Sequence, residues 1–463
     1  MKTTMKRIFL FSVAAVVATG CSIYGKYKRP ENVVATDSLY RADLVEGVEA
    51  PDTMTIAYMS WEEVFTDAHL QDLIRLGLDS NVNLQSAILR VEAAKAQLSA
   101  AKWAYAPSIV LAPQGGLTSI DGGKASWSYN LGASASWDID LFGSLLNAKR
   151  GAQAALLQQD AYRQAVKSQL IATIANSYYG LLMLDEQVKI SGESIEIWKE
   201  QVRTLEAKLK VGLVTENAVT QARANLYGLE ASHANLEKQL IDSEYSLCAL
   251  LGMPPFRIER NSLAEQTLPD NLNVGLPIQL LENRPDVKQA EMTLASAYYS
   301  TNRARSAFYP GLKLSGSAGW TNSLGQAVSN PGAWLLNALA SLSEPIFNHG
   351  KLVANLKVSK AEEEVAKLNY RQTILDAGRQ VNSNIVAIET ATTMLEKHTA
   401  QCRDLERTVK TAEDMYRYSS AGSYLEILTA RQSLLSAQLN AISDQYQRLS
   451  ATVLLYQSLG GGR

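Results

Sequence analysis

The chain has 463 residues and a net charge of −2, the difference between 44 basic and 46 acidic residues. This near-neutral balance gives no support for a phosphate-binding surface, so we expect no nucleic-acid partner. Three Cys and four scattered His exclude a disulfide framework and argue against a multi-His metal centre. The sequence has no nucleophile elbow, phosphate loop or zinc motif, so we expect no enzyme, no metal and no cofactor.

The first twenty residues have the pattern of an export signal. Three basic residues precede an apolar run at 8–18. This run is shorter than the roughly 20 residues of a membrane-spanning helix, but it fits a secretory signal. The small residues 18–20 stand directly before Cys21, as in a bacterial lipobox, so we expect a lipoprotein signal peptide over 1–20 and acylation of Cys21. The alternative is an ordinary signal peptide with an incidental Cys.

We expect an N-terminal lipid anchor and periplasmic segment over 21–60, and long helices beyond it. Residues 114–253 and 346–463 contain no proline, which permits helices there because a proline inside a helix costs about 3 kcal/mol. Apolar side chains recur every three or four residues in both stretches, which favours helices over strands. We predict long helices over 145–252 and 350–459.

The two halves of the chain repeat each other. Residues 73–107 align with 276–310 at an offset of 203, and farther along the offset drifts to 208. The matched identities are Ala87/Ala290, Ala94/Ala297, Ala101/Ala304, Ala104/Ala307, Pro107/Pro310, Asn147/Asn355, Lys149/Lys357, Tyr162/Tyr370, Arg163/Arg371, Leu251/Leu459 and Gly252/Gly460. We therefore predict a first structural repeat over 61–255, an inter-repeat linker over 256–275 and a second repeat over 276–463.

Each repeat contains one region with strand character. Residues at about 108–142 and 311–347 are poor in charge and alternate small or polar with apolar side chains. Turn signals at Asp121-Gly122-Gly123 and Asn330-Pro331-Gly332 divide each region into two expected strands. Strands of about ten residues with this alternation are the size that crosses an outer membrane.

Four such strands predict an oligomer. They cannot close into a barrel, and an open sheet edge in lipid leaves backbone groups unpaired at several kcal/mol each. Two chains would supply eight strands, and three chains would supply twelve with room for a lumen. Long helices that are apolar on more than one face also need neighbours on both sides. A closed ring of helices coaxial with a closed ring of strands satisfies both demands, and the result is a pore.

With these features the chain resembles the TolC-like outer-membrane efflux factors, in particular the lipoprotein (NodT-type) branch that serves tripartite resistance-nodulation-division pumps. The resemblance runs from Cys21 to Gly461, essentially the mature chain. The matching residues are Tyr27-Lys28-Arg29-Pro30, Trp61, Phe65, Asp67, Leu70, Leu276-Pro277, Leu280-Leu281, Arg284-Pro285-Asp286-Val287, Ala290-Glu291, Glu344-Pro345-Ile346-Phe347, Tyr424-Leu425-Glu426-Ile427-Leu428 and Leu459-Gly460-Gly461. Taken in this order they are specific, although each alone is weak.

The resemblance implies a mainly α fold with a membrane β-barrel. A duplicated long-helix and β-hairpin repeat would form a homotrimeric 12-stranded β-barrel coaxial with a 12-helix α-barrel. The protein would lie in the outer membrane of a Gram-negative bacterium, lipid-anchored, with its helical part in the periplasm. It would be a passive exit duct for an inner-membrane transporter, to which a periplasmic adaptor protein joins it.

The resemblance also implies a gate at the periplasmic end, where helix-turn-helix tips pinch the duct shut. Gly212 and Gly422 mark the two turns. The family often places an acidic pair after the second turn, and here Glu426 fills its first position and Thr429 its second, so half of that feature is retained. The other gate candidates are Tyr416, Arg417, Tyr418 and Tyr424. The tip residues expected to dock the adaptor are Gly212, Glu216, Gly422 and Ser423.

Several alternatives stay open. Three copies of Glu426 would form a carboxylate ring that favours cations, or the side chain is merely solvated or paired with a neighbouring subunit. The same type of duct serves type I protein secretion. A lipid-anchored periplasmic adaptor is a further alternative, but adaptors usually carry one helical hairpin, whereas this chain has two long-helix units. The cargo is not specified by any residue pattern.

Overall fold

The computed structural model describes residues 24–30, 34, 39, 56–119, 122–267, 283–324, 327–418 and 423–462. Cys21 and Gly422 lie outside these described residues. The chain divides into two compact units. Unit 1 consists of Met1–Val33, Leu89–Ala161 and Lys288–Gln372, and unit 2 consists of Val34–Ile88, Tyr162–Val287 and Thr373–Arg463. Each unit therefore takes segments from both halves of the sequence.

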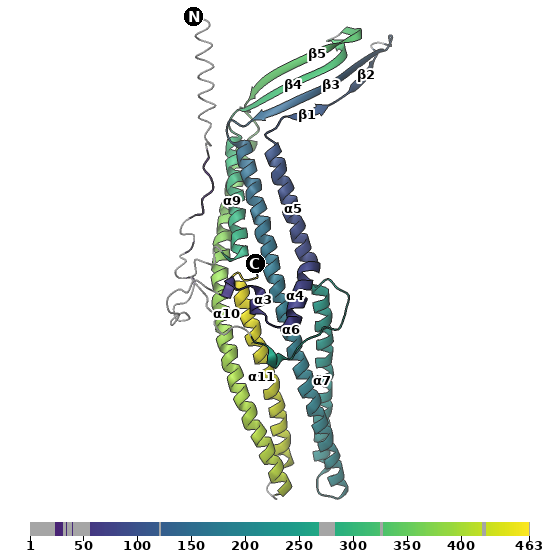
Figure 1. The fold of residues 1–463 in the computed structure, drawn as a ribbon, viewed down its shortest axis with the longest axis vertical. Helices are drawn as coiled ribbons and strands as arrows, with labels where there is room; N and C mark the ends of the chain where they lie inside the picture. Colours follow the sequence, from purple (N-terminus) through teal and green to yellow (C-terminus); the bar gives the residue numbers. More distant parts are fainter. Residues whose placement is uncertain are drawn as a thin grey trace. The chain divides into compact units, whose positions relative to one another are not determined.

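The element order repeats helix, strands, long helix and second helix (Figure 1). This is the duplicated, mainly helical arrangement that the sequence predicts. The elements in chain order are η2 (Ile56–Tyr58), α3 (Trp61–Val64), α4 (Ala68–Ser80), α5 (Val82–Trp103), β1 (Ser108–Leu111), β2 (Gln114–Thr118), β3 (Ser126–Ile139), α6 (Ser144–Lys210), α7 (Glu216–Leu250), η3 (Leu263–Glu265), α9 (Pro285–Ser306), β4 (Gly311–Leu324), β5 (Ala327–Ser343), α10 (Lys351–Tyr418) and α11 (Tyr424–Ser458).

All five strands belong to one antiparallel sheet in unit 1, with β1, β3, β4 and β5 paired in that order (Figure 1). β2 also pairs with β3, so that β1 and β2 follow one another along the same partner. The break between them falls at Pro113, which has no amide hydrogen to donate to the ladder. The region at 108–142 therefore contains three strands and not the two that were expected.

The turn predicted at Asn330-Pro331-Gly332 is wrong. β4 ends at Leu324 and β5 already begins at Ala327, so these three residues lie within β5. The β4–β5 register passes from the pair Thr321–Ala333 to the pair Ser323–Val328, which leaves extra residues on β5. A β-bulge accommodates such residues without ending the strand, and it tolerates a proline that cannot donate to the ladder.

Three of the long helices end in the same way, at a glycine. Gly212, Gly252 and Gly460 follow α6, α7 and α11 with φ of +74°, +70° and +91°. In each case the glycine amide and the next amide donate to carbonyls in the last turn, for example Gly252 to Ala249 at 3.0 Å and Met253 to Cys248 at 3.0 Å. This pair of bonds is the Schellman motif, in which a left-handed residue ends a helix.

The repeat is visible in the contacts at these helix ends in unit 2. The Asn81 side chain donates to the Leu250 carbonyl at 2.7 Å, and the Arg284 side chain donates to the Ser458 carbonyl at 2.8 Å. Arg284 is offset from Asn81 by 203 residues and Ser458 from Leu250 by 208, the offsets found in the sequence. In the first repeat, the residue before α5 therefore donates to a carbonyl at the end of α7. In the second repeat, the residue before α9 does the same at the end of α11.

Unit 2 is held together by helix packing. Buried side chains of α6 at 195, 198, 202 and 205 alternate spacings of three and four, and they contact buried side chains of α7 at 219, 222 and 226. This spacing is that of knobs-into-holes packing between paired helices. Among the described residues, no helix combines the length and the apolar character of a membrane span.

Candidate functional site

The first helical tip lies at the end of α6 and the start of α7. Gly212 is exposed, has φ +74°, and has no other atom within 4 Å of the position a side chain would take. Leu213 beside it is 72 % exposed, which is unusual for a large apolar side chain. Glu216 is exposed and is the first residue of α7, where a carboxylate interacts favourably with the helix dipole. This tip therefore presents both an exposed apolar and an exposed acidic side chain.

The second tip lies at the end of α10 and the start of α11. Gly422, its predicted turn residue, is outside the described residues, whereas Ser423 caps α11 by accepting from the Leu425 amide at 3.3 Å. Tyr418 is 78 % exposed, and its ring centroid lies 6.0 Å from the Arg417 guanidinium carbon. A cation and an aromatic ring at this distance attract each other weakly when both are exposed.

Two tyrosines of the second tip contact α6. The rings of Tyr416 and Tyr424 are 6.0 Å apart, and the Lys208 ammonium lies 4.1 Å from the centre of the Tyr416 ring. The Tyr424 hydroxyl donates to Gln201 at 3.5 Å. Burial raises the pKa of Tyr424 to about 12, with Tyr416 adding to the rise and Arg431 opposing it, so the phenol is neutral at ordinary pH. These contacts join the second helical hairpin, α10 and α11, to α6 of the first helical hairpin, α6 and α7.

A groove of about 570 Å³ lies beside these tyrosines, between α6 and the second hairpin. Arg431 of α11 pairs there with Glu413 of α10, and both side chains are half-buried. The groove therefore carries a cation, an anion and aromatic rings close together. Its polar and aromatic lining is Glu196, Glu200, Gln201, Thr204, Lys208, Glu413, Tyr416, Arg417, Tyr424 and Arg431.

Glu426 and Thr429 line a different groove. It has a volume of about 770 Å³ and lies between α10 and α11, with Arg407 and Met415 on its α10 side. Both Glu426 and Thr429 are exposed, and the Thr429 hydroxyl donates to the Leu425 carbonyl one turn earlier at 2.9 Å. The six gate candidates are thus divided. Tyr416, Arg417 and Tyr424 line the groove beside α6, Glu426 and Thr429 line the α10–α11 groove, and Tyr418 lines neither of the two.

Local sequence reasoning missed three partners of these tyrosines. Gln201 and Lys208 lie in α6, far from the second turn in sequence, whereas Arg431 lies near it in α11. As residues that favour helices, none of the three gave a separate signal. The spacing of Tyr424, Ile427 and Arg431 at intervals of three and four is the one pattern that could have shown a common face.

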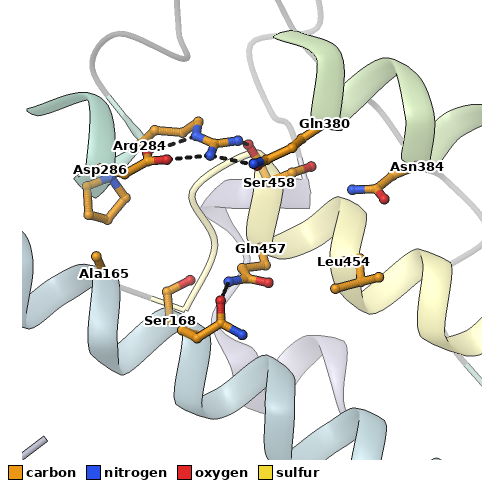
Figure 2. Close-up of a pocket in the computed structure, with 11 residues that line it drawn as sticks. Ala165, Ser168, Arg284, Asp286, Gln380, Asn384, Leu454, Gln457 and Ser458 are labelled. Carbon is orange, nitrogen blue, oxygen red and sulfur yellow. Dashed lines mark hydrogen bonds and ion pairs between the residues drawn. The ribbon is translucent and has the colours of Figure 1, made fainter. Parts of the chain in front are cut away.

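A second polar cavity, of about 430 Å³, surrounds the start of α9 (Figure 2). The Arg284 side chain is 7 % exposed and donates to both carboxylate oxygens of Asp286, at 2.9 and 2.5 Å. It also donates to Gln380 at 2.8 Å, and Figure 2 shows the guanidinium between these partners and Ser458. Through these contacts Arg284 joins the start of α9 to the end of α11 and to the middle of α10, which is a structural role.

Comparison with known proteins gives the family. Residues 73–253 and 276–461 match the family described as outer membrane efflux protein. The toluene efflux pump outer membrane protein TtgC of Pseudomonas putida is 28 % identical over 99 % of this chain and 96 % of its own length. SilC of Salmonella typhimurium, described as a probable outer membrane lipoprotein, is 28 % identical over 99 % of both chains.

A solved structure adds the fold. The outer membrane channel MtrE of Neisseria gonorrhoeae, solved in its open state, superposes with a TM-score of 0.83 at 25 % identity, over 96 % of this chain and 98 % of that one. The helical repeats, the single sheet and the match of both halves agree with one another. This chain belongs to the outer membrane efflux protein family.

Proposed function

We propose that this protein is the exit duct of a tripartite efflux pump and that three copies close its sheet into one twelve-stranded barrel in the outer membrane. An inner-membrane transporter and a periplasmic adaptor would supply the energy and the connection. Because the sequence contains two repeats, three copies would give six similar sectors around one axis.

The register of the sheet carries this proposal. Trp137, Leu314 and Ala340 are direct cross-strand neighbours, and so are Leu131, Trp320 and Trp334. Side chains that stand opposite each other in register point to the same face. Their sequence neighbours Ser136, Ser315 and Ser341 therefore fall on the other face. One face of the sheet is thus apolar throughout, and the other is mainly small or polar with exceptions such as Leu335 and Leu339, as suits a barrel between lipid and a wet lumen.

The edges of the sheet support the same conclusion. Within the described residues β5 pairs with β4 alone, and β1 and β2 pair with β3 alone. Both edges therefore present backbone donors and acceptors that would be costly in lipid. Pairing between β5 of one copy and β1 of another satisfies these groups.

Lipidation of Cys21 is part of the proposal. Tyr24, three residues later, contacts the start of α6, because its carbonyl accepts from the Arg150 side chain at 3.5 Å. The small residues 18–20 before Cys21 and the description of SilC as a lipoprotein favour acylation there. Labelling of the protein by a fatty-acid probe in cells, and its loss in Cys21→Ser, is the expected result.

The central test is deletion of this protein followed by complementation. The deletion strain is compared with its parent in susceptibility to drugs, bile salts and metal ions. The molecular mass of the purified mature protein is measured in detergent. We expect sensitisation to at least one of these classes, restoration by the wild-type gene, and the mass of a trimer. Unchanged susceptibility across the panel together with a monomeric mass would overturn the proposal, and a defect in protein export alone would favour the type I secretion alternative.

We also propose that the tips form the gate and dock the adaptor. If Glu426 narrows the duct, Glu426→Ala should raise single-channel conductance or reduce cation selectivity in planar bilayers. Glu389→Ala removes an exposed carboxylate from α10 away from the tip and is the matched control. Equal conductance and selectivity in the two variants would remove Glu426 from the gate. Crosslinks to the adaptor confined to the strands, and absent from 211–218 and 417–426, would contradict the docking assignment.

A further inference from the structure

We propose that Asp138 of β3 and Lys313 of β4 determine how the strand-lined part of the duct treats charged solutes. The two residues have opposite charges and stand directly opposite each other in the sheet. As a pair they keep the wall electrically balanced, so that solutes of either charge pass. This inference rests on the proposed function, because it requires the polar face of the sheet to line a water-filled lumen.

The register places this pair on the polar face. The adjacent pair in the ladder, Trp137 with Leu314, belongs to the apolar face. Successive residues of a strand point to opposite faces, so Asp138 and Lys313 point away from the lipid. Both residues are exposed in the single chain. The two charges therefore face the expected lumen, where an ion in transit can sense them.

The strands that the structure describes contain no other charged residue. β1, β2 and β5 have none, and β3 and β4 have one each. The neighbours of the pair on the same face are the uncharged residues Ser136, Ser315 and Ser341. The Ser341 hydroxyl donates to the Lys313 carbonyl at 3.3 Å. Each copy thus contributes one positive and one negative charge among neutral side chains.

Asp140, the next acidic residue after β3, is engaged at the start of α6. Its carboxylate accepts from the Leu146 amide at 2.7 Å. A carboxylate in the first turn of a helix interacts favourably with the positive end of the helix dipole. Asp140 therefore serves the helix and does not take the place of Asp138 in the strand pair.

The short distance between the two strand charges makes them cancel. Residues directly opposite each other on antiparallel strands have Cβ atoms about 4.5–5.5 Å apart. This separation is shorter than the screening length of about 8 Å at physiological ionic strength. An ion in the lumen therefore senses a dipole, whose field falls off quickly. If either member is neutralised, the other stays as an unbalanced charge on every copy, and the low-dielectric wall strengthens its field.

A cysteine on the same face can report this local potential. Ser315 is two residues from Lys313, about 7 Å along β4, so a thiol there senses both members of the pair. The full-length Ser315→Cys protein in intact cells is treated with an anionic and a cationic methanethiosulfonate, added outside. These reagents reach the strands without passing the periplasmic gate. Both react with the same thiolate, so the ratio of the two rates reports the local charge and not the reactivity of the thiol.

We expect opposite effects from the two members of the pair. Lys313→Gln should lower the ratio of the anionic to the cationic rate by a factor of about three, and Asp138→Asn should raise it by a similar factor. The double variant should return the ratio to that of the native pair. Lys313→Arg keeps the charge in place and should leave the ratio unchanged, whereas a purely structural role of the lysine would not predict this pattern.

A second reporter tests whether the effect is local. Ser128→Cys lies on the same face of β3, ten residues from Asp138 and therefore about 33 Å away. This distance is several screening lengths, so the ratio at Ser128→Cys should not respond to either substitution. The chain without an added cysteine gives the background from Cys248 and Cys402.

The outcomes separate this inference from the proposed function. A ratio at Ser315→Cys that neither variant changes, or that both change in the same direction, would overturn the inference and leave the duct intact. An equal response at Ser128→Cys would overturn it as well. No labelling of Ser315→Cys, in protein that fractionation places in the outer membrane, would overturn both, because the polar face would then not line a water-filled lumen.

Discussion

At the scale of single residues, Arg284 concentrates more interactions than any neighbour at the start of α9. Its guanidinium satisfies Asp286, Gln380 and the Ser458 carbonyl at once. Arg284→Ala would leave these groups without a donor in a largely buried place, so we expect a loss of about 2 kcal/mol. The measurement is the thermal unfolding midpoint of the purified protein.

Two further variants sharpen that comparison. Asn81→Ala at the repeat-related position removes a neutral side chain that caps α5 and covers Leu250, so a loss of about 1 kcal/mol is expected. Arg284→Lys keeps the charge but loses the two-pronged contact with Asp286, and its midpoint should fall between those of Arg284→Ala and the wild type. A midpoint of Arg284→Ala equal to that of the wild type would show that the arginine contributes nothing to the fold.

Asp67 in unit 2 gives a prediction about acid. Burial alone would raise the pKa of its carboxyl, but hydrogen bonds from Tyr178 and Gln266 and from two backbone amides outweigh burial and lower the pKa. A lowered pKa means that the native state favours the charged form, so the carboxylate stabilises the fold above the unfolded-state pKa of about 3.9. That stability is lost as the pH falls through the lower pKa of the folded protein.

The test compares Asp67→Asn with the wild type across pH. We expect Asp67→Asn to be less stable at pH 7, and the difference from the wild type to shrink as the pH is lowered below about 4. Thermal midpoints from pH 7 to pH 3 measure this. A constant difference over the whole range would mean that the loss comes from packing or cap geometry and not from the charge of Asp67.

At the scale of helices, the glycines that end α6 and α7 allow backbone strain and steric overlap to be measured separately. Gly212 and Gly252 share a positive φ, but a Cβ on Gly212 would meet nothing, whereas a Cβ on Gly252 would lie 2.8 Å from the Ser80 carbonyl oxygen. Gly212→Ala should therefore cost only the backbone strain, about 1 kcal/mol, and Gly252→Ala should cost clearly more. The thermal unfolding midpoints of the two variants measure this difference. An equal loss of stability in both would show that the backbone at Ser80 can move away from the new Cβ at no energetic cost.

Helix positions could be predicted from sequence because their causes are local. Proline-free stretches and a regular apolar period determine where a helix can form, and a glycine that adopts positive φ determines where it ends, as at Gly252 and Gly460. Asn330-Pro331-Gly332 is the opposite case. Its residues are typical of a turn, but pairing with β4 on both sides makes a bulge the lower-energy outcome.

The candidate site was less accessible to such reasoning. The family resemblance points to the tip turns, of which the structure describes Gly212, but the surface that each gate residue lines depends on how α10 and α11 pack against α6. Tyr424 donates a hydrogen bond to Gln201, and the Tyr416 ring contacts the Lys208 ammonium. In both pairs the α6 partner comes from the other half of the chain. Contacts of this kind are set by packing between distant segments, which a local pattern does not contain.

At the scale of the whole molecule, the sheet must have one face toward lipid if the assembly is a membrane duct. Leu314 stands between Trp137 and Ala340 on the apolar face, and Ser315 stands between Ser136 and Leu339 on the other. These adjacent residues differ in the direction in which they point and share every other feature of position along β4. They therefore allow the assignment of faces to be tested by one charge placed on either side.

We expect Leu314→Arg to impair stable incorporation into the outer membrane, because an arginine on the lipid face of a barrel is unfavourable, by up to about 2–4 kcal/mol at the mid-depth of the bilayer, and each trimer would carry three. Ser315→Arg adds the same charge toward the lumen and should leave incorporation intact, while its three positive charges shift selectivity toward anions. Membrane fractionation and heat-dependent gel mobility measure the first effect, and bilayer recordings measure the second. If Ser315→Arg is the variant that fails to incorporate, the polar face meets the lipid and the orientation of the sheet must be reversed.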